Sequence, residues 1–94
     1  MVFRHIVLFR IHDHVSDAYV DAVIDTLESF VLFPGVVSWR TTRSLDERKG
    51  RVVVEDATFE SREAFERFRT DPAHASAAKT MAEIADWWVG DYEE

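Results

Sequence analysis

Histidine is the residue type in this sequence best suited to acid–base chemistry near neutral pH, because its unperturbed pKa lies close to the physiological range. His74 is the third residue of a helix that Asp71 caps and Pro72 begins. The positive end of the helix dipole disfavours an imidazolium in this first turn, whereas the charge of Asp71 favours it. His74 is therefore a candidate general base or axial ligand. The alternative is a helix-start histidine bonded to a carbonyl or to water.

A second histidine, His5, lies within the β-rich segment VFRHIVLFRIH at residues 2–12. On a strand it shares a face with four apolar residues, Phe3, Val7, Phe9 and Ile11. A histidine in such surroundings is more often a hydrogen-bonded core residue than a catalyst. If this face meets the helices, however, His5 and His74 could share one cavity.

Two further groups of polar residues are weaker candidates for a site. His12, Asp13 and His14 resemble a metal-binding cluster, but Asp13 would point away from the two histidines on a strand, so we expect a solvated turn and no metal. Tyr19 and Tyr92 could donate hydrogen bonds to a ligand, although a packed tyrosine with its hydroxyl bonded is the usual case. The basic residues at 40–51 flank Asp46 and Glu47, which favours a solvated, salt-bridged loop.

Length and composition restrict the class of protein. Ninety-four residues predict one domain, spanning 1–94, and a hydrophobic content of 47% excludes disorder. The absence of cysteine excludes disulfides, iron–sulfur clusters and thiol catalysis. A net charge of −7 argues against nucleic acid or an anionic membrane as the main partner. No segment suggests a membrane span, a signal peptide or a nucleotide-binding loop, so we expect a cytoplasmic protein without a cofactor.

The apolar periodicity predicts a ferredoxin-like β-α-β-β-α-β order, in which an antiparallel four-stranded sheet carries its helices on one face. The expected strands are 2–12, 36–43, 51–59 and 87–92, and the expected helical segments are 16–32, 61–69 and 71–86. If His5 faces the helices, Ile6 and Leu8 lie on the uncovered face. Exposed apolar patches of this kind mark interfaces, so we predict a homodimer through the open sheet face.

Three sequence features together carry a family resemblance. They are FRHIVLFRIHD at the first strand, FPGVVSW after the first helix, and TFESREAFERFRTDPAHASA with its Pro-Ala-His motif. Over essentially its whole length the chain resembles the stress-responsive A/B barrel (Dabb) domains of the dimeric α+β barrel superfamily. The resemblance implies a ferredoxin-like protomer and a homodimer whose two sheets form a barrel.

Plant polyketide cyclases of this family close a poly-β-ketone by aldol condensation, and their resemblance to this chain implies specific roles. His74 stands in the place of their general base, and His5 in the place of a histidine that lines the same cavity. The tyrosine that assists the base corresponds to Phe68, and a third-strand histidine corresponds to Val53. The cavity implied for this chain is therefore mainly apolar.

The leading hypothesis is a homodimer with an apolar cavity for a hydrophobic or aromatic small molecule, with acid–base lyase or cyclase chemistry at His74 and His5. The candidate walls are Phe65, Phe68, Phe9, Val7 and Tyr19. One alternative is a stress-associated structural dimer whose cavity is filled by side chains. Another is a monooxygenase of the antibiotic-biosynthesis or haem-degrading type, because these enzymes share the pattern Ser-x-Glu-Ala-Phe before a helical histidine.

Overall fold

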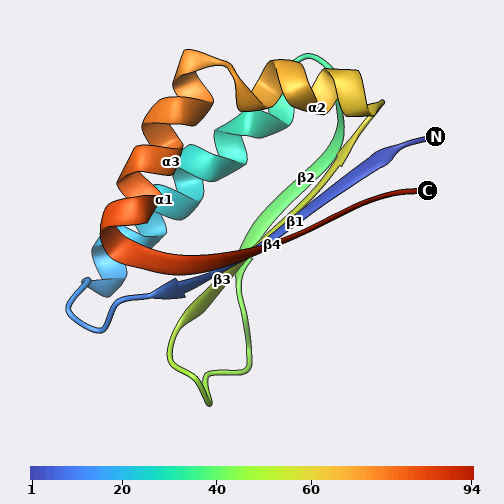
Figure 1. Cartoon of the computed structure of the whole chain (residues 1–94). Helices are drawn as coiled ribbons and strands as arrows, with labels where there is room; N and C mark the ends of the chain where they lie inside the picture. The colour runs from blue at the N-terminus through green and yellow to red at the C-terminus, as the bar shows by residue number, and fades with distance from the viewer.

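A computed structural model describes all residues from 1 to 94 and has a ferredoxin-like arrangement of strands and helices (Figure 1). Three helices cover one face of a four-stranded sheet, and the opposite face carries no helix (Figure 1). The strands are β1 (Phe3–Ile11), β2 (Val36–Arg43), β3 (Val52–Phe59) and β4 (Ala85–Glu93). The helices are α1 (Asp17–Glu28), which a 3-10 turn (Ser29–Leu32) follows, α2 (Arg62–Arg69) and α3 (Pro72–Ile84).

All strand pairs in the sheet are antiparallel, in the order β2-β3-β1-β4. The alternation of residues along β1 decides which face is covered: Phe3, His5, Val7, Phe9 and Ile11 are buried beneath the helices. The residues between them lie on the uncovered face, where Leu8 pairs with Trp88 of β4 and with Val54 of β3. His5 therefore faces the helices, and the prediction that Ile6 and Leu8 then lie on the open face is confirmed.

Each helix begins at a residue whose side chain accepts a backbone hydrogen bond. Ser16 accepts from Tyr19, Ser61 from Ala64, and Asp71 from Ala73, so the first turn of each helix has one of its free N–H groups satisfied. The chain turns between α2 and α3 because Pro72 starts a new helix at its first position. This turn brings the beginning of α3 back over the sheet.

The core is a cluster of buried apolar side chains between the sheet and the helices, with Phe59 and Phe68 fully enclosed at its centre. Gly35 lies in the turn before β2 with a φ of 92°, a conformation that favours glycine. A methyl group at this position would lie 2.8 Å from the Cβ atom of Ala64. Both the turn and the close approach of α2 therefore require glycine here.

Two element ends differ from the sequence prediction. The first helix stops at Glu28 and continues as the 3-10 turn, because Pro34 and Gly35 follow shortly and the chain must bend toward β2. The last strand begins at Ala85, before the two tryptophans, and pairs with β1 along its whole length. No helix combines the length and the apolar character needed to cross a membrane.

Candidate functional site

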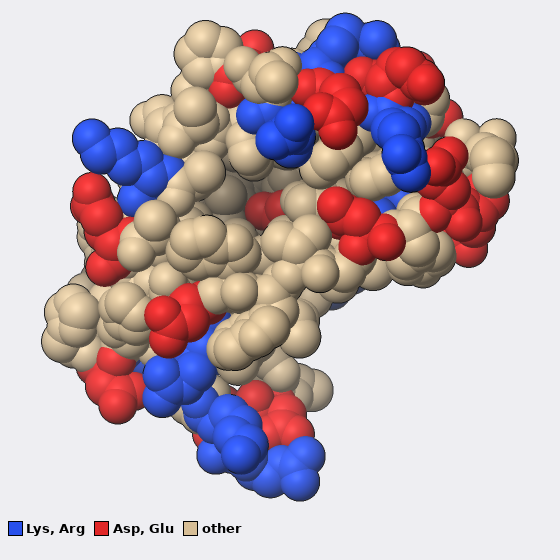
Figure 2. All heavy atoms as spheres, viewed as in Figure 1, with Lys and Arg blue, Asp and Glu red and all other residues tan.

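A cavity of about 370 Å³ lies between the sheet and the helices α1, α2 and α3. Figure 2 shows it as a hollow near the centre of the molecule, with acidic atoms in its depth. The apolar lining residues are Val7, Phe9, Leu27, Phe65, Ala77, Ala78, Met81, Trp87 and Val89. The polar ones are His5, Glu55, Glu66, Arg69, His74 and Asp91. The cavity is thus a mainly apolar space with a small group of titratable side chains.

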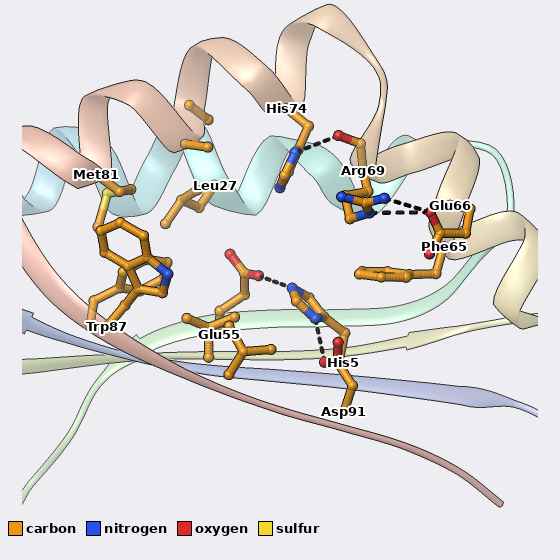
Figure 3. A pocket seen from close by; sticks show the side chains of 15 residues that line it. His5, Leu27, Glu55, Phe65, Glu66, Arg69, His74, Met81, Trp87 and Asp91 are labelled. Carbon is orange, nitrogen blue, oxygen red and sulfur yellow. Dashed lines mark hydrogen bonds and ion pairs between the residues drawn. The ribbon is translucent and has the colours of Figure 1, made fainter.

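His74 enters the cavity from the first turn of α3. Its Nδ1 lies 3.0 Å from the carbonyl oxygen of Arg69, at the end of α2. A carbonyl oxygen accepts only, so Nδ1 carries the hydrogen and donates it. The other ring nitrogen, Nε2, is then the one free to accept a proton, and it points into the cavity (Figure 3). The ring also lies against Phe68, with 4.6 Å between the two ring centroids.

His5 faces the cavity from β1 and lies between two carboxylates. Its Nδ1 is 2.7 Å from Oδ1 of Asp91 on β4, and its Nε2 is 3.2 Å from Oε2 of Glu55 on β3 (Figure 3). The pairing of strands explains this geometry, because β1 lies between β3 and β4 and its register sets His5 directly opposite Asp91. A histidine with a carboxylate at each ring nitrogen is best matched as an imidazolium, which donates from both.

The environments of the two histidines shift their pKa values in opposite directions. Burial lowers the pKa of His74, and the hydrogen bond to the Arg69 carbonyl offsets this only in part. Burial also acts to lower the pKa of His5, but the hydrogen bonds and charges of Glu55 and Asp91 outweigh it and raise the pKa. The cavity therefore shifts His74 toward its neutral form and His5 toward its protonated form. Oppositely shifted groups of this kind are the usual arrangement of an acid–base pair.

The edge strand β4 forms the rim of the cavity. The side chains of Trp87 and Val89 line it although both are half-exposed, because no further strand covers this edge of the sheet. On the other side the rim is formed by α2, where Arg69 pairs with Glu66 at 2.9 Å. The cavity thus has an opening through which a small molecule could enter without unfolding a helix.

Five of the residues singled out in the sequence line this cavity: His74, His5, Phe65, Phe9 and Val7. Phe65 lies against His5, with 4.7 Å between the ring centroids. Phe68 is instead fully buried in the core behind His74. Tyr19 is exposed on α1 and lines a separate groove, because its position on the helix turns it away from the sheet.

The two carboxylates that contact His5, those of Glu55 and Asp91, were not predicted from the sequence. A signal for Glu55 was present: in β3 it alternates with Val53, Ala57 and Phe59, all of which are buried, and a charged residue in that series must lie on the covered face. Asp91 gives no comparable signal, since nearly every residue of β4 is exposed.

The remaining polar candidates lie outside the cavity. Nε2 of His12 is 3.4 Å from Oδ1 of Asp86, and the rings of His12 and His14 lie 5.9 Å apart, at the surface turn after β1. No group of three or more His, Asp or Glu side chains is placed so that it could hold a metal ion. Tyr92 is exposed on the open face of the sheet, where Arg4 lies over its ring.

Comparisons with solved structures show the same fold. A dimeric ferredoxin-like protein of unknown function from Thermobifida fusca is 23% identical with a TM-score of 0.88, over 100% of this chain and 92% of that one. The hydroxynitrile lyase of Passiflora edulis is 23% identical with a TM-score of 0.84, over 97% and 91%. The cofactor-independent oxygenase SnoaB of Streptomyces nogalater is 21% identical with a TM-score of 0.79, over 99% and 92%.

No curated protein sequence matches the chain. The family model of the stress responsive A/B barrel domain matches residues 3–94, which is nearly the whole chain. The strand order and the helices on one face of the sheet agree with the resemblance seen in the sequence. This chain is therefore a member of the stress-responsive A/B barrel (Dabb) domain family.

Proposed function

We propose that this protein binds a small hydrophobic or aromatic molecule in the cavity and removes a proton from it, with His74 as the general base. The observation that carries the proposal is the hydrogen bond from His74 Nδ1 to the Arg69 carbonyl. It fixes the tautomer in which Nε2 is a free acceptor, and it orients that nitrogen toward the space a ligand would fill (Figure 3).

His5 is the proposed partner of this base. A proton leaves a carbon next to a carbonyl group and bonds to Nε2 of His74. The electron pair of the broken C–H bond forms a C=C bond, and the π pair of the carbonyl group moves onto its oxygen. The imidazolium of His5 donates a hydrogen bond to that oxygen from Nε2, which it shares with Glu55. Asp91 holds the ring from the opposite side at Nδ1.

The apolar lining supports a hydrophobic substrate class. Phe65 and Trp87 offer aromatic surfaces, and Val7, Phe9 and Met81 complete an apolar lining that favours burial of a ring or an alkyl group. Lyase chemistry is consistent with one structural neighbour, a hydroxynitrile lyase, although that similarity extends to the fold alone. The charged side chains of the cavity all lie near the two histidines or at the rim (Figure 3).

Deuterium exchange at the central carbon of 1-phenyl-1,3-butanedione tests the proposal, because this carbon lies between two carbonyl groups. The protein should accelerate exchange in D2O, measured by proton NMR, and His74→Ala should reduce the acceleration by about 100-fold or more. His14→Ala is the matched control, since His14 is exposed on a surface turn and should leave the rate unchanged. Equal rates for the His74 variant and the unmodified protein would remove His74 from this role.

We also propose that the protein is a homodimer through the open sheet face. This face carries an apolar patch made of Ile6, Leu8, Val54 and Trp88, with Leu8 and Trp88 substantially exposed. Two of the structural neighbours are described as dimeric ferredoxin-like proteins, from Thermobifida fusca and Bacteroides fragilis. An apolar surface of this kind on a small domain is stabilised by a second copy that removes it from water.

A further inference from the structure

A second hollow, a groove of about 260 Å³, lies between α1 and α3 on the outer side of the cavity. The α1 residues that line it are Tyr19, Ala22, Val23, Thr26 and Leu27, and the α3 residues are Ala73, Ser76, Ala77, Thr80 and Met81. Three of these residues, Leu27, Ala77 and Met81, also line the cavity described above. The side chains of these three residues therefore border both spaces.

Met81 lines the far end of the cavity. It lies beside Trp87 at the end opposite Phe65 and the histidines, whereas Leu27 lies near the middle (Figure 3). Met81 is buried, and Ala77 is too small to form a barrier. Methionine is unbranched and has three rotatable side-chain bonds, so it fills irregular space without a rigid shape.

We propose that Met81 determines the length of ligand that the cavity accepts, and that the groove between α1 and α3 is the extension which a longer apolar tail would enter. The ligand class is a molecule with a polar head and an unbranched apolar tail, the head lying at His5 and His74 and the tail pointing along the cavity to Met81. The orientation rests on the proposed function, since it assigns the polar head to the histidines.

The small residues along α3 explain why the extension exists. Apart from Met81, the α3 residues that line the groove are Ala73, Ser76, Ala77 and Thr80, and none is large enough to fill the space between the two helices. The two helices lie side by side over the sheet (Figure 1). A tail that passed Met81 would thus meet the apolar side chains of Val23 and Ala22 without displacing a helix.

Binding of 4-n-alkylphenols with tails from ethyl to octyl, measured by calorimetry, tests the inference without requiring turnover. Each buried methylene strengthens binding by about fourfold. The affinity of the unmodified protein should stop rising once the tail reaches Met81. In Met81→Ala it should continue to rise, so that octylphenol binds at least about tenfold more tightly than to the unmodified protein, while ethylphenol binds within about twofold of its original affinity.

Two control variants make the result specific. Met81→Leu keeps a side chain of similar size and should retain the original length limit. Ser76→Phe, placed in the Met81→Ala background, fills the groove from an exposed position on α3 and should cancel the gain for octylphenol. If the alanine variant unfolds below the assay temperature, Met81→Val removes less volume and should show the same trend over fewer methylenes.

The inference is overturned if affinity depends on tail length in the same way for Met81→Ala and for the unmodified protein. It is also overturned if Ser76→Phe leaves the gain in octylphenol affinity intact, or if no alkylphenol binds to either protein. A shifted length dependence without deuterium exchange on the diketone would leave the inference standing and overturn the proposed function alone. The two claims can therefore fail separately.

Discussion

Nδ1 of His74, near the start of α3, lies 3.0 Å from the carbonyl oxygen of Arg69 at the end of α2. This contact joins two helices across the turn at Asp71 and Pro72, and it sets both the orientation and the tautomer of the histidine. A histidine at a helix start is commonly bonded to a carbonyl. Here the bond leaves Nε2 facing a cavity that also contains His5.

The first prediction concerns pH. Because burial lowers the pKa of His74, the neutral base should already be present somewhat below the ordinary histidine range. Despite burial, the carboxylates of Glu55 and Asp91 raise the pKa of His5, so its imidazolium should persist above that range. The kcat/KM for deuterium exchange should therefore rise through the His74 pKa and fall through the His5 pKa, with a plateau across neutral pH. A single ionisation controlling the whole profile would contradict this assignment.

The second prediction is that Glu55→Gln destabilises the protein more at pH 6 than at pH 9. His5 has a raised pKa in the folded state, so its stabilising contribution is complete below the unfolded pKa and is lost as pH rises through the folded pKa. Removing the Glu55 carboxylate should lower the free energy of unfolding by about 1–3 kcal/mol at pH 6. At pH 9 the loss should be smaller.

Urea unfolding at the two pH values measures this difference, and proton NMR of the His5 ring should show its pKa reduced in the variant. Glu83→Gln, at an exposed position of α3, is the control and should change stability by no more than about 0.5 kcal/mol at either pH. An equal loss of stability at pH 6 and pH 9 would show that Glu55 acts by packing and not by its charge.

The third prediction concerns assembly. Leu8→Glu places a charge at the centre of the open-face patch, beside Trp88 and Val54. Sedimentation should change from twice the chain mass of 10.9 kDa to the mass of one chain. Leu45→Glu is the control, since Leu45 is fully exposed in the loop between β2 and β3 and should leave the dimer intact. A monomeric mass for the unmodified protein at micromolar concentration would refute the proposed dimer.

The fourth prediction concerns the turn before β2. Gly35→Ala should destabilise the protein by about 2–4 kcal/mol, because alanine is strained at a φ of 92° and its methyl group would lie 2.8 Å from the Ala64 Cβ atom. Gly90→Ala is the matched control in β4, where no atom lies within 4 Å of the added methyl group. Its unfolding free energy should stay within about 1 kcal/mol of the original. Chemical denaturation compares the two variants directly, and equal losses would rule out the steric cause.

The fifth prediction is that Arg51→Ala loosens the connection between β1 and α1. Its Nη2 donates to the carbonyl oxygens of His12 and Val15, at 3.1 and 2.6 Å, and its Nη1 donates to Asp17 at 2.9 Å. The His12 carbonyl still accepts from the Val15 N–H, but the Val15 carbonyl loses its donor, and the loss of these bonds should cost about 2–3 kcal/mol. Arg67→Ala, on the exposed side of α2, should cost much less. Amide hydrogen exchange should show faster opening of residues 12–17 in the Arg51 variant alone.

The sequence by itself determined the order of the elements and which residues of β1 share a face. Alternation in the first segment placed His5 with Phe3, Val7 and Phe9, and Ser16, Ser61 and Asp71 marked helix starts that the structure confirms. These features are local: the period of a strand and the cap of a helix depend on residues a few positions apart.

Tertiary structure alone decided which side chains meet. Arg51 was expected in a solvated loop of salt bridges, yet it bonds carbonyl groups of the chain near residue 13, because β3 pairs with β1. In the same way, Asp91 meets His5 across 86 positions of sequence through the pairing of β4 with β1. Composition and periodicity do not specify the register between distant strands, so the contact of Asp91 with His5 could be identified only from the tertiary structure.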